Sequence, residues 1–321
     1  MIEQGVACIL QNLPGFIALL NMLLKPLLLF FFFSCAVHVY AQHHFVQYND
    51  KNGLPSNLVY FVYQDKKGFI WIATDEGVCR FDGSEFRHYN TPDGLGSNEV
   101  FRIAEDTSGK LFFYTSDNAL SYYEKGRIQN ASALGFKGKL LISTFSSLFF
   151  SSDNRLCANF GFSQYQYPFT GSGVDTVYSL TQPQKEYSYK TPTGTKTVAA
   201  SALAFLKKEL ADEGISYENI FTKPFRLAFS GDTLLLVTKN FVSLYKISGK
   251  QIFKIKRIDF TGEANAVDLI KPDILSVTSF NKGTQIISLN NESSRQQFNP
   301  AGFTTHSLVD REGNYWLATY N

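Results

Sequence analysis

The amino-acid sequence predicts an all-β protein: a seven-bladed β-propeller, whose last blade is incomplete, with one amphipathic helix inserted near residues 198–213. Three observations lead to this fold class. The chain repeats with a period of about 40 residues, each repeat alternates short strands with turns, and the composition favours strands. Of the 321 residues, 30 are Phe, 17 are Tyr and 23 are Gly. Aromatic residues favour strands, and glycine favours tight turns.

The repeat is clearest near the start of the chain. When the sequence is shifted by 41 residues, eleven residues between Phe45 and Phe81 meet identical residues between positions 86 and 122. Residues 310–319 copy residues 65–74, and their separation, 310 − 65 = 245, is close to six periods of 41. A repeat of this length built from short strands is typical of one propeller blade. The residues that define the repeat are Asp65, Gly68, Trp71, Thr74, Asp106, Gly109, Phe112, Thr115, Asp310, Gly313, Trp316 and Thr319.

A threonine marks the same position in five of the seven expected repeats. These threonines are Thr74, Thr115, Thr238, Thr278 and Thr319. The two remaining positions are expected near residues 156 and 197. The turn at 153–155 and the strand after it suit the first position, and the turn at 190–194 and the strand after it suit the second.

The first repeat shows how one blade is built. Its pattern predicts a turn at Asp65–Gly68 and four strands, at residues 58–64, 69–74, 78–81 and 85–89. The aspartate can accept backbone N–H bonds inside the turn, and the glycine can adopt a positive φ. The aromatic residue at position 71 is expected to wedge between neighbouring blades. We therefore interpret the shared residues as structural rather than catalytic.

A leading strand is expected to close the ring. Residues Phe45–Asn49 align with Phe86–Asn90, the fourth strand of the first repeat. A strand of this kind can close a propeller by joining the final blade. Because the final repeat reaches Asn321 after its second strand, we expect a third strand of roughly 8–15 residues beyond it, as part of a longer protein.

One stretch interrupts the strand pattern. Its apolar residues recur at helical spacing, and Gly214 is expected to end the helix. We expect this helix to pack on or between blades, and we interpret the face formed by residues 207–209 as solvated. The apolar residues are Val198, Ala202, Phe205, Leu206 and Leu210.

The N-terminus has the pattern of an export segment. Lys25 supplies a positively charged region, residues 26–36 supply an apolar region, and residues 39–41 resemble a cleavage motif. We interpret residues 1–41 as a signal peptide that is cut between Ala41 and Gln42. Translation is expected to start at Met22, because the residues before it do not resemble the start of a signal peptide. An uncleaved anchor helix and a lipoprotein attached through Cys35 are the alternatives.

Export assigns the mature part, residues 42–321, to a compartment outside the cytoplasm. Its two cysteines, Cys79 and Cys157, are expected to be buried apolar residues rather than a disulfide. The net charge is 30 − 28 = +2, so no basic excess is present to bind a phosphate backbone. Nucleic acid is therefore not expected as a partner.

No pattern of catalytic or metal-binding residues occurs in the mature sequence. Its histidines are His43, His44, His88 and His306, and none lies in a metal-ligand motif or a readable catalytic set. We expect no enzyme activity in this chain and no cofactor. The ligand-binding residues are not identified, because equivalent loops differ between repeats.

Three parts of the chain resemble the two-component regulator propeller repeat. The first is Gly53–Asn57 with Gln64–Val78 and Arg80–Gly83, the second is Asp93–Asn98, and the third is Asp310–Thr319. The resemblance is specific over residues 45–128 and 303–319 and weak over 130–300. This family implies an exported sensor domain of a bacterial membrane histidine kinase, whose propeller lies in the periplasm ahead of a transmembrane helix and a kinase.

The resemblance implies a sensing function. The transmembrane and kinase parts are absent from this chain, which contains no phosphoacceptor segment and no ATP-binding box. The implied partners are a small ligand, with carbohydrate breakdown products as one class, the downstream domains that tether the protein to the inner membrane, and a second copy in a homodimer. Two other functions stay open: a secreted propeller enzyme that acts on polysaccharide, and a protein-interaction scaffold.

Overall fold

The structure is a computed structural model, and the chain divides into two compact units, Met1–Gln47 and Tyr48–Asn321. The elements below belong to the second unit. The predicted signal peptide apart from Lys25, its cleavage site and the His43–His44 pair lie outside the described residues. The described residues are Lys25 and 45–117, 119–136, 147–160, 163–167, 175–178, 186–191, 194–215, 225–230, 233–260, 264–271, 273–279, 282–291, 295–298 and 302–320.

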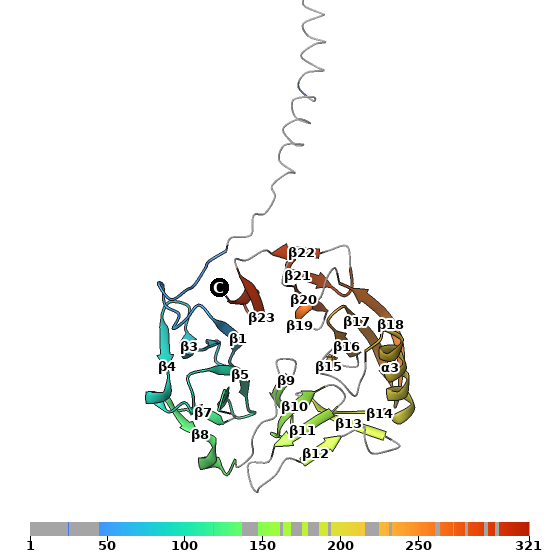
Figure 1. The fold of residues 1–321 in the computed structure, drawn as a ribbon, viewed down its shortest axis with the longest axis horizontal. Coiled ribbons are helices and arrows are strands. Elements are labelled where there is room, and N and C mark those ends of the chain that lie inside the picture. Colours follow the sequence, from blue (N-terminus) through green and yellow to red (C-terminus); the bar gives the residue numbers. More distant parts are fainter. Residues whose placement is uncertain are drawn as a thin grey trace, which may run out of the picture. The chain divides into compact units, whose positions relative to one another are not determined.

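The second unit is a β-propeller with one helix, and Figure 1 shows its sheets arranged around a common axis. Blade 1 contains β1 (Val59–Gln64), β2 (Ile70–Thr74), β3 (Gly77–Phe81) and β4 (Phe86–Tyr89). Blade 2 contains β5 (Val100–Glu105), β6 (Leu111–Thr115), β7 (Leu120–Glu124) and β8 (Arg127–Asn130). Blade 3 contains β9 (Ser147–Phe150), β10 (Leu156–Phe160), β11 (Ser163–Tyr167) and β12 (Asp175–Tyr178).

Two further four-stranded blades and two smaller sheets follow. The blades are β15 (Phe225–Ser230), β16 (Thr233–Thr238), β17 (Phe241–Ser248) and β18 (Gln251–Asp259), then β19 (Ala264–Lys271), β20 (Ile274–Ser279), β21 (Gly283–Ser288) and β22 (Arg295–Phe298). The two-stranded sheets are β13 (Glu186–Thr191) with β14 (Gly194–Ala199), and the final sheet, β23 (Phe303–Val309) with β24 (Tyr315–Tyr320). Two short 3-10 helices, η1 (Thr91–Asp93) and η2 (Ala131–Leu134), follow β4 and β8.

Each blade is an antiparallel meander. Its first strand lies nearest the axis and its fourth lies at the outside (Figure 1). The four strands predicted for the first repeat agree with β1–β4 to within one residue at each end. The predicted count of seven blades is not confirmed, because only five of the sheets formed by the described residues contain four strands. The β13–β14 hairpin is nevertheless formed where the repeat predicts a strand near residue 197.

Blade 3 departs from the spacing of 41 residues. Ser151 takes the place of the repeat aspartate, since its N–H donates to the carbonyl four residues on and its carbonyl accepts from Asn154, as around Asp65 and Asp106. Asn154 adopts a positive φ of 60° in place of the repeat glycine. Ser151 lies 151 − 106 = 45 residues after Asp106. The position predicted near residue 156 is therefore wrong, because these four extra residues place Leu156 at the start of the second strand instead of its end.

A large aromatic side chain fills the space between consecutive blades, as predicted. Trp71 in β2 is fully buried, and its ring centroid lies 5.6 Å from that of Phe113 and 4.9 Å from that of Tyr123, both in blade 2. Phe112 in β6 lies 4.8 Å from Phe150 in blade 3. The same position therefore connects blade 1 to blade 2 and blade 2 to blade 3.

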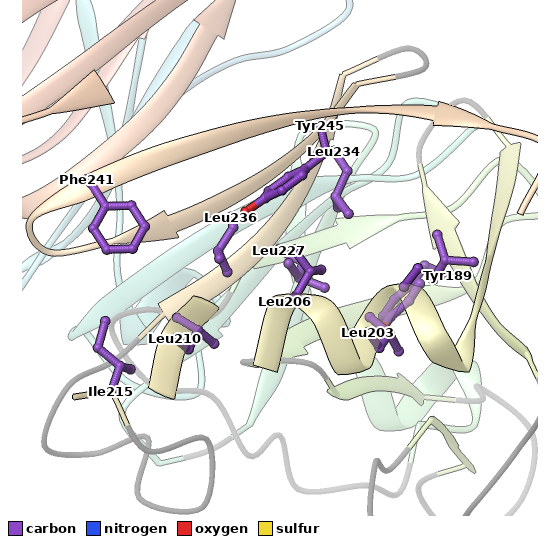
Figure 2. Packing of buried hydrophobic residues seen from close by; sticks show 12 residues of the cluster. Tyr189, Leu203, Leu206, Leu210, Ile215, Leu227, Leu234, Leu236, Phe241 and Tyr245 are labelled. Carbon is purple, nitrogen blue, oxygen red and sulfur yellow. The ribbon is translucent and has the colours of Figure 1, made fainter. Parts of the chain in front are cut away.

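The predicted helix is α3 (Ala200–Asp212), and it packs on the blade that contains β15–β18. Its buried residues include Leu203, Leu206 and Leu210, which Figure 2 shows directed at sheet residues such as Leu227 and Leu236. The helix is followed by Gly214 with a φ of 66°, as expected for a residue that ends a helix.

The prediction that residues 207–209 form a solvated face is wrong for Glu209. Its carboxylate accepts hydrogen bonds from Ser243 Oγ at 2.8 Å, from Lys254 Nζ at 2.6 Å and from the Tyr245 hydroxyl. The helix packs close enough to β17 and β18 for these donors to reach the carboxylate. Burial works to raise the pKa of Glu209, but the three donors outweigh burial and leave this pKa lowered.

The leading strand predicted at residues 45–49 is not formed, because these residues have no regular structure. In a complete blade the fourth strand pairs with the third. The final sheet contains two strands within the described residues, so it has no third strand with which residues 45–49 could pair. Tyr48 contacts the final sheet through its ring instead, which stacks on Trp316 at 6.0 Å.

Removal of the wedge at Trp71 tests its importance for the fold. Trp71→Ala should destabilise the protein by about 3–5 kcal/mol, because it leaves a large cavity between two blades. Trp71→Phe should be milder, since Phe112 fills the same position in blade 2. The measurement is urea unfolding followed by fluorescence and circular dichroism. Ile255→Ala, at a side chain that is 53% exposed, is the control and should change stability by less than about 0.5 kcal/mol. Equal effects at both positions would contradict the wedge.

Candidate functional site

The repeat aspartate holds both its turn and the aromatic wedge. Asp65 Oδ1 accepts the backbone N–H groups of Lys67 at 2.9 Å and Phe69 at 3.0 Å. Asp65 Oδ2 accepts the indole N–H of Trp71 at 2.8 Å. One carboxylate therefore fixes the turn between β1 and β2 and also the orientation of the ring between the blades.

The final sheet contains the same arrangement. Asp310 accepts from the backbone N–H of Asn314 at 2.7 Å and from the indole N–H of Trp316 at 2.8 Å. In blade 2, Asp106 accepts from the turn N–H groups of Ser108 and Lys110 and from the Ser108 hydroxyl, and Phe112 has no donor to offer it. The sequence pattern predicted the turn bonds but not the indole bond. Its signal is the shared spacing of six residues between aspartate and tryptophan, which occurs in both repeats that carry tryptophan.

The repeat glycine is required by its backbone conformation and not by space. Gly68 has a φ of 98°, and a Cβ built there would meet no atom within 4 Å. The equivalent glycines, Gly109 and Gly313, have φ values of 86° and 93°. Side chains other than glycine rarely adopt these values.

The repeat threonine closes the turn at the other end of the blade. Thr74 Oγ1 donates to the Gly77 carbonyl at 2.8 Å and accepts from the Glu76 N–H at 3.1 Å. Thr238 makes the same donation to the Phe241 carbonyl at 2.9 Å. Each blade therefore has an aspartate end, with the turn between its first and second strands, and a threonine end, with the turn between its second and third strands.

At the aspartate end of blade 1, blade 2 and the final sheet, the residue after the repeat position connects its sheet to the next one around the ring. Its backbone N–H donates to a side chain of the following blade. The shortest donor–acceptor distance in each pair is 2.8–3.0 Å. We call these bonds the inter-blade latches. The three pairs are Lys66 with Glu105, Thr107 with Asn154, and Arg311 with Gln64.

The latch between the final sheet and blade 1 is the most extensive. Besides the bond from its N–H to Gln64, the Arg311 guanidinium donates to the carbonyls of Asp65 and Lys66. Gln64 Nε2 in turn donates to Glu312 at 2.9 Å. These bonds join residues about 246 positions apart, so the two ends of the described propeller meet here.

The inner strands complete this closure. Thr305 Oγ1 in β23 donates to the Val59 carbonyl in β1 at 2.6 Å, and the Val62 N–H donates to His306 Nδ1 at 3.3 Å. The His306 ring also stacks on Phe61, with centroids 3.9 Å apart. His306, to which the sequence analysis assigned no role, therefore acts in closing the ring.

At the threonine end, a group of aromatic and acidic residues surrounds the first strand of blade 1. The Tyr60 hydroxyl donates to Glu99 Oε1 at 2.8 Å, and the Tyr60 ring lies 5.1 Å from that of Phe101. Burial, and then the bond to Glu99 and its negative charge, raise the pKa of Tyr60, and the nearby Asp75 carboxylate adds to this effect. We call Tyr60, Asp75, Glu99, Phe101 and Tyr320 the inner rim.

The inner rim combines groups that suit a polyhydroxylated ligand. Asp75 Oδ1 is buried and has no hydrogen-bond partner within the described residues, so its capacity to accept a hydrogen bond is unused. Tyr320 is 45% exposed and stacks on Phe303 at 6.3 Å. Carboxylate oxygens accept hydroxyl hydrogens, and aromatic faces cover apolar C–H surface. Sequence reasoning missed this group, because its members come from three different repeats.

Other predicted residues occupy structural positions. Cys79 and Cys157 are buried, as predicted, and burial raises the pKa of the Cys79 thiol to about 12. His88 Nε2 lies 2.7 Å from the Gly53 carbonyl. Over the described part of the chain, no group of three or more His, Cys, Asp or Glu residues could hold a metal ion. The same part contains no helix with the length and apolar character needed to cross a membrane.

Comparison with known families supports the resemblance seen in the repeats. Residues 53–76 match the model of the two component regulator propeller family. This segment contains the Asp65 turn, the Trp71 wedge and Thr74. The predicted resemblance is therefore confirmed for this repeat.

Solved structures confirm the propeller fold. The extracellular domain of BT3049 from B. thetaiotaomicron, described as a hybrid two component system, aligns with 86% of this chain at 14% identity and a TM-score of 0.53. This chain spans 40% of that protein's length. The β-propeller domain of Cps50 (Swd1) from Myceliophteria thermophila aligns with 84% of this chain and 99% of its own, at 11% identity and a TM-score of 0.52. No curated protein matches the sequence.

The turn of the final sheet should depend on pH through Asp310. Burial works to raise the pKa of this carboxyl, but the bonds from Trp316 and Asn314 outweigh it and leave the pKa lowered. A lowered pKa means that the carboxylate stabilises the fold above its unfolded value, about 3.9, and that this contribution is lost as pH falls through the folded value.

Asp310→Asn tests this dependence. The variant should be less stable by about 1–3 kcal/mol near pH 7, because charge-assisted hydrogen bonds are lost. The difference from the wild type should shrink below about pH 4. Urea unfolding between pH 3 and 8 measures it, with Asp50→Asn as a control at an exposed carboxylate. A difference that stays constant over this range contradicts the role of the charge.

The latch at Glu105 should show the opposite pH dependence. Burial raises the pKa of Glu105, so its contribution to stability is full below the unfolded value, about 4.3, and is lost as pH rises through the folded value. Glu105→Gln keeps an acceptor for Lys66, as Gln64 does at the equivalent position in blade 1. The wild type should therefore lose stability relative to Glu105→Gln as pH rises from about 4 to 7.

Glu105→Ala is the matched comparison for this latch. It removes the acceptor and should cost about 1–3 kcal/mol, since the part-buried Tyr63 hydroxyl and the Lys66 N–H both lose their partner. The measurement is the urea midpoint of the three proteins at pH 4.5, 6 and 7.5. The latch is not supported if the alanine variant is as stable as the glutamine variant.

Proposed function

We propose that this chain is the ligand-sensing propeller of an exported protein that acts in two-component signal transduction. In this proposal residues 1–41 direct export, residues 42–321 form the sensor, and the full protein continues into a membrane span and a histidine kinase. The propeller then lies in the periplasm, tethered to the inner membrane. The match of residues 53–76 to the two component regulator propeller family carries the proposal.

The proposal includes a ring of seven blades. The 41-residue period and the seven sheets formed by the described residues support this number. The β13–β14 sheet and the final sheet would each hold one blade position. The latches and the Trp316 wedge support the second assignment, because they connect the final sheet to blade 1 as the same groups connect blades 1 and 2.

The ligand is proposed to bind at the inner rim. Tyr60 and Asp75 belong to blade 1, Glu99 and Phe101 to blade 2 and its entry, and Tyr320 to the final sheet. A small neutral saccharide is the ligand class that these carboxylates and exposed rings suit best. Because the rim includes both sides of the closure, ligand binding would stabilise one arrangement of the final sheet against blade 1 and bias whatever follows it. A second copy in a homodimer could transmit the same shift.

A thermal-shift screen of the full chain tests the site. Neutral mono- and oligosaccharides and cell-wall fragments serve as probes, and at least one should raise the unfolding temperature of the wild type. Glu99→Gln and Tyr60→Phe should weaken the binding of that probe at least tenfold. The first removes a carboxylate that can accept hydrogen bonds from sugar hydroxyls, and the second removes the hydroxyl that positions this carboxylate.

Glu85→Gln is the control, since Glu85 lies in the turn between β3 and β4, at the aspartate end of blade 1. It should leave the response unchanged. A response that is equal in all variants would place the ligand elsewhere. No response to any probe in the wild type would contradict saccharide sensing by this propeller.

A further inference from the structure

Two arginines lie directly opposite one another on neighbouring strands of blade 1. Arg80 in β3 pairs with Arg87 in β4, and Arg80 also pairs with Trp71 in β2. Cross-strand partners share one face of a sheet, and like charges placed opposite one another destabilise it. Because Trp71 faces Tyr123 of blade 2, the two arginines lie on the side of blade 1 that faces blade 2.

Aromatic rings position both guanidinium groups but leave their edges free. The Arg80 guanidinium lies 4.3 Å from the centroid of the Phe69 ring, and that of Arg87 lies 5.3 Å from the Tyr89 ring. Stacking of this kind uses the flat face of a guanidinium, whereas its five N–H donors point outward in its plane. The Arg80 Nε is buried and has no hydrogen-bond partner within the described residues, which is costly for a charged group.

The carboxylate that acts on Arg80 is engaged elsewhere. Asp82 and Arg80 interact through their charges, but Asp82 accepts from the N–H groups of Ser84 and Glu85. Within the part of the chain that the structure describes, neither arginine forms an ion pair.

We infer that Arg80 and Arg87 form a binding site for an oxyanion, a carboxylate or a sulfate group, at the outer strands between blades 1 and 2. An oxyanion would neutralise the opposed charges and supply the acceptor that Arg80 Nε lacks. Two guanidinium edges match the planar, bidentate geometry of such groups. Arg87 is exposed, so a ligand can reach the pair from solvent. The site is separate from the inner rim and goes beyond the proposed function.

The oxyanion could be a free inorganic ion or an acidic group on a saccharide, and the probes distinguish the two. Isothermal titration of the full chain uses sodium sulfate, sodium glucuronate and, as the uncharged comparison, glucose, all at matched ionic strength with sodium chloride. The wild type should bind sulfate or glucuronate and not glucose. Tighter binding of glucuronate assigns an acidic saccharide, and tighter binding of sulfate assigns a free inorganic anion. Either result supports the site.

Three substitutions test the residues. Arg87→Gln and Arg80→Gln should each weaken anion binding at least tenfold, and Arg87→Lys should lose most of it, because lysine keeps the charge but not the bidentate edge. Arg127→Gln, at an exposed arginine in β8, is the control and should bind like the wild type.

Thermal unfolding tests the anion site independently of the binding measurement. In chloride alone, Arg87→Gln should unfold at the same temperature as the wild type or above it, because the repulsion is removed. Sulfate should raise the unfolding temperature of the wild type and not of Arg87→Gln. The inference fails if sulfate acts equally on the wild type, Arg87→Gln and Arg127→Gln, or if chloride reproduces its effect.

Discussion

The carboxylate of the repeat aspartate is the interaction on which the seams between blades depend. In blade 1 and in the final sheet it binds the turn N–H groups and the indole N–H of a tryptophan at the same time. One carboxylate thus fixes both the conformation of the turn and the orientation of the tryptophan ring. The turn and the packing against the next blade therefore cannot change independently. In blade 2, where Phe112 replaces the tryptophan, shape alone positions the ring.

One seam differs from the others in the length of chain that it closes. Blades 1 and 2 meet through residues about 40 positions apart, whereas the final sheet meets blade 1 through residues about 246 positions apart. The entropy of closing so long a loop opposes this contact. Among the described residues, a large set of inter-blade bonds lies here, with Arg311, Gln64, Thr305 and His306 each contributing.

The sequence predicted what depends on local pattern. Strands β1–β4, the Asp65 turn and α3 follow from alternation, turn residues and helical spacing, which act over a few residues. It did not predict the shift at Ser151, because serine and asparagine can replace the aspartate and glycine in the same turn. It also failed for Glu209, whose partners Ser243 and Lys254 come from other strands, and for the inner rim, which only the closed ring brings together. Periodicity shows that a repeat exists but not how many repeats form full blades.

If the inner rim binds the ligand, as proposed, its location would link sensing to ring closure. Tyr320 belongs to the final sheet and forms an isolated antiparallel β-bridge with Leu58, the residue that directly precedes β1. A ligand that touches both Tyr60 and Tyr320 can bind only while this seam is closed, so binding must stabilise the closed seam by the same free energy by which closure favours binding. In the proposed function, the seam with the highest entropic cost would therefore also be the one through which a ligand has most influence on the fold.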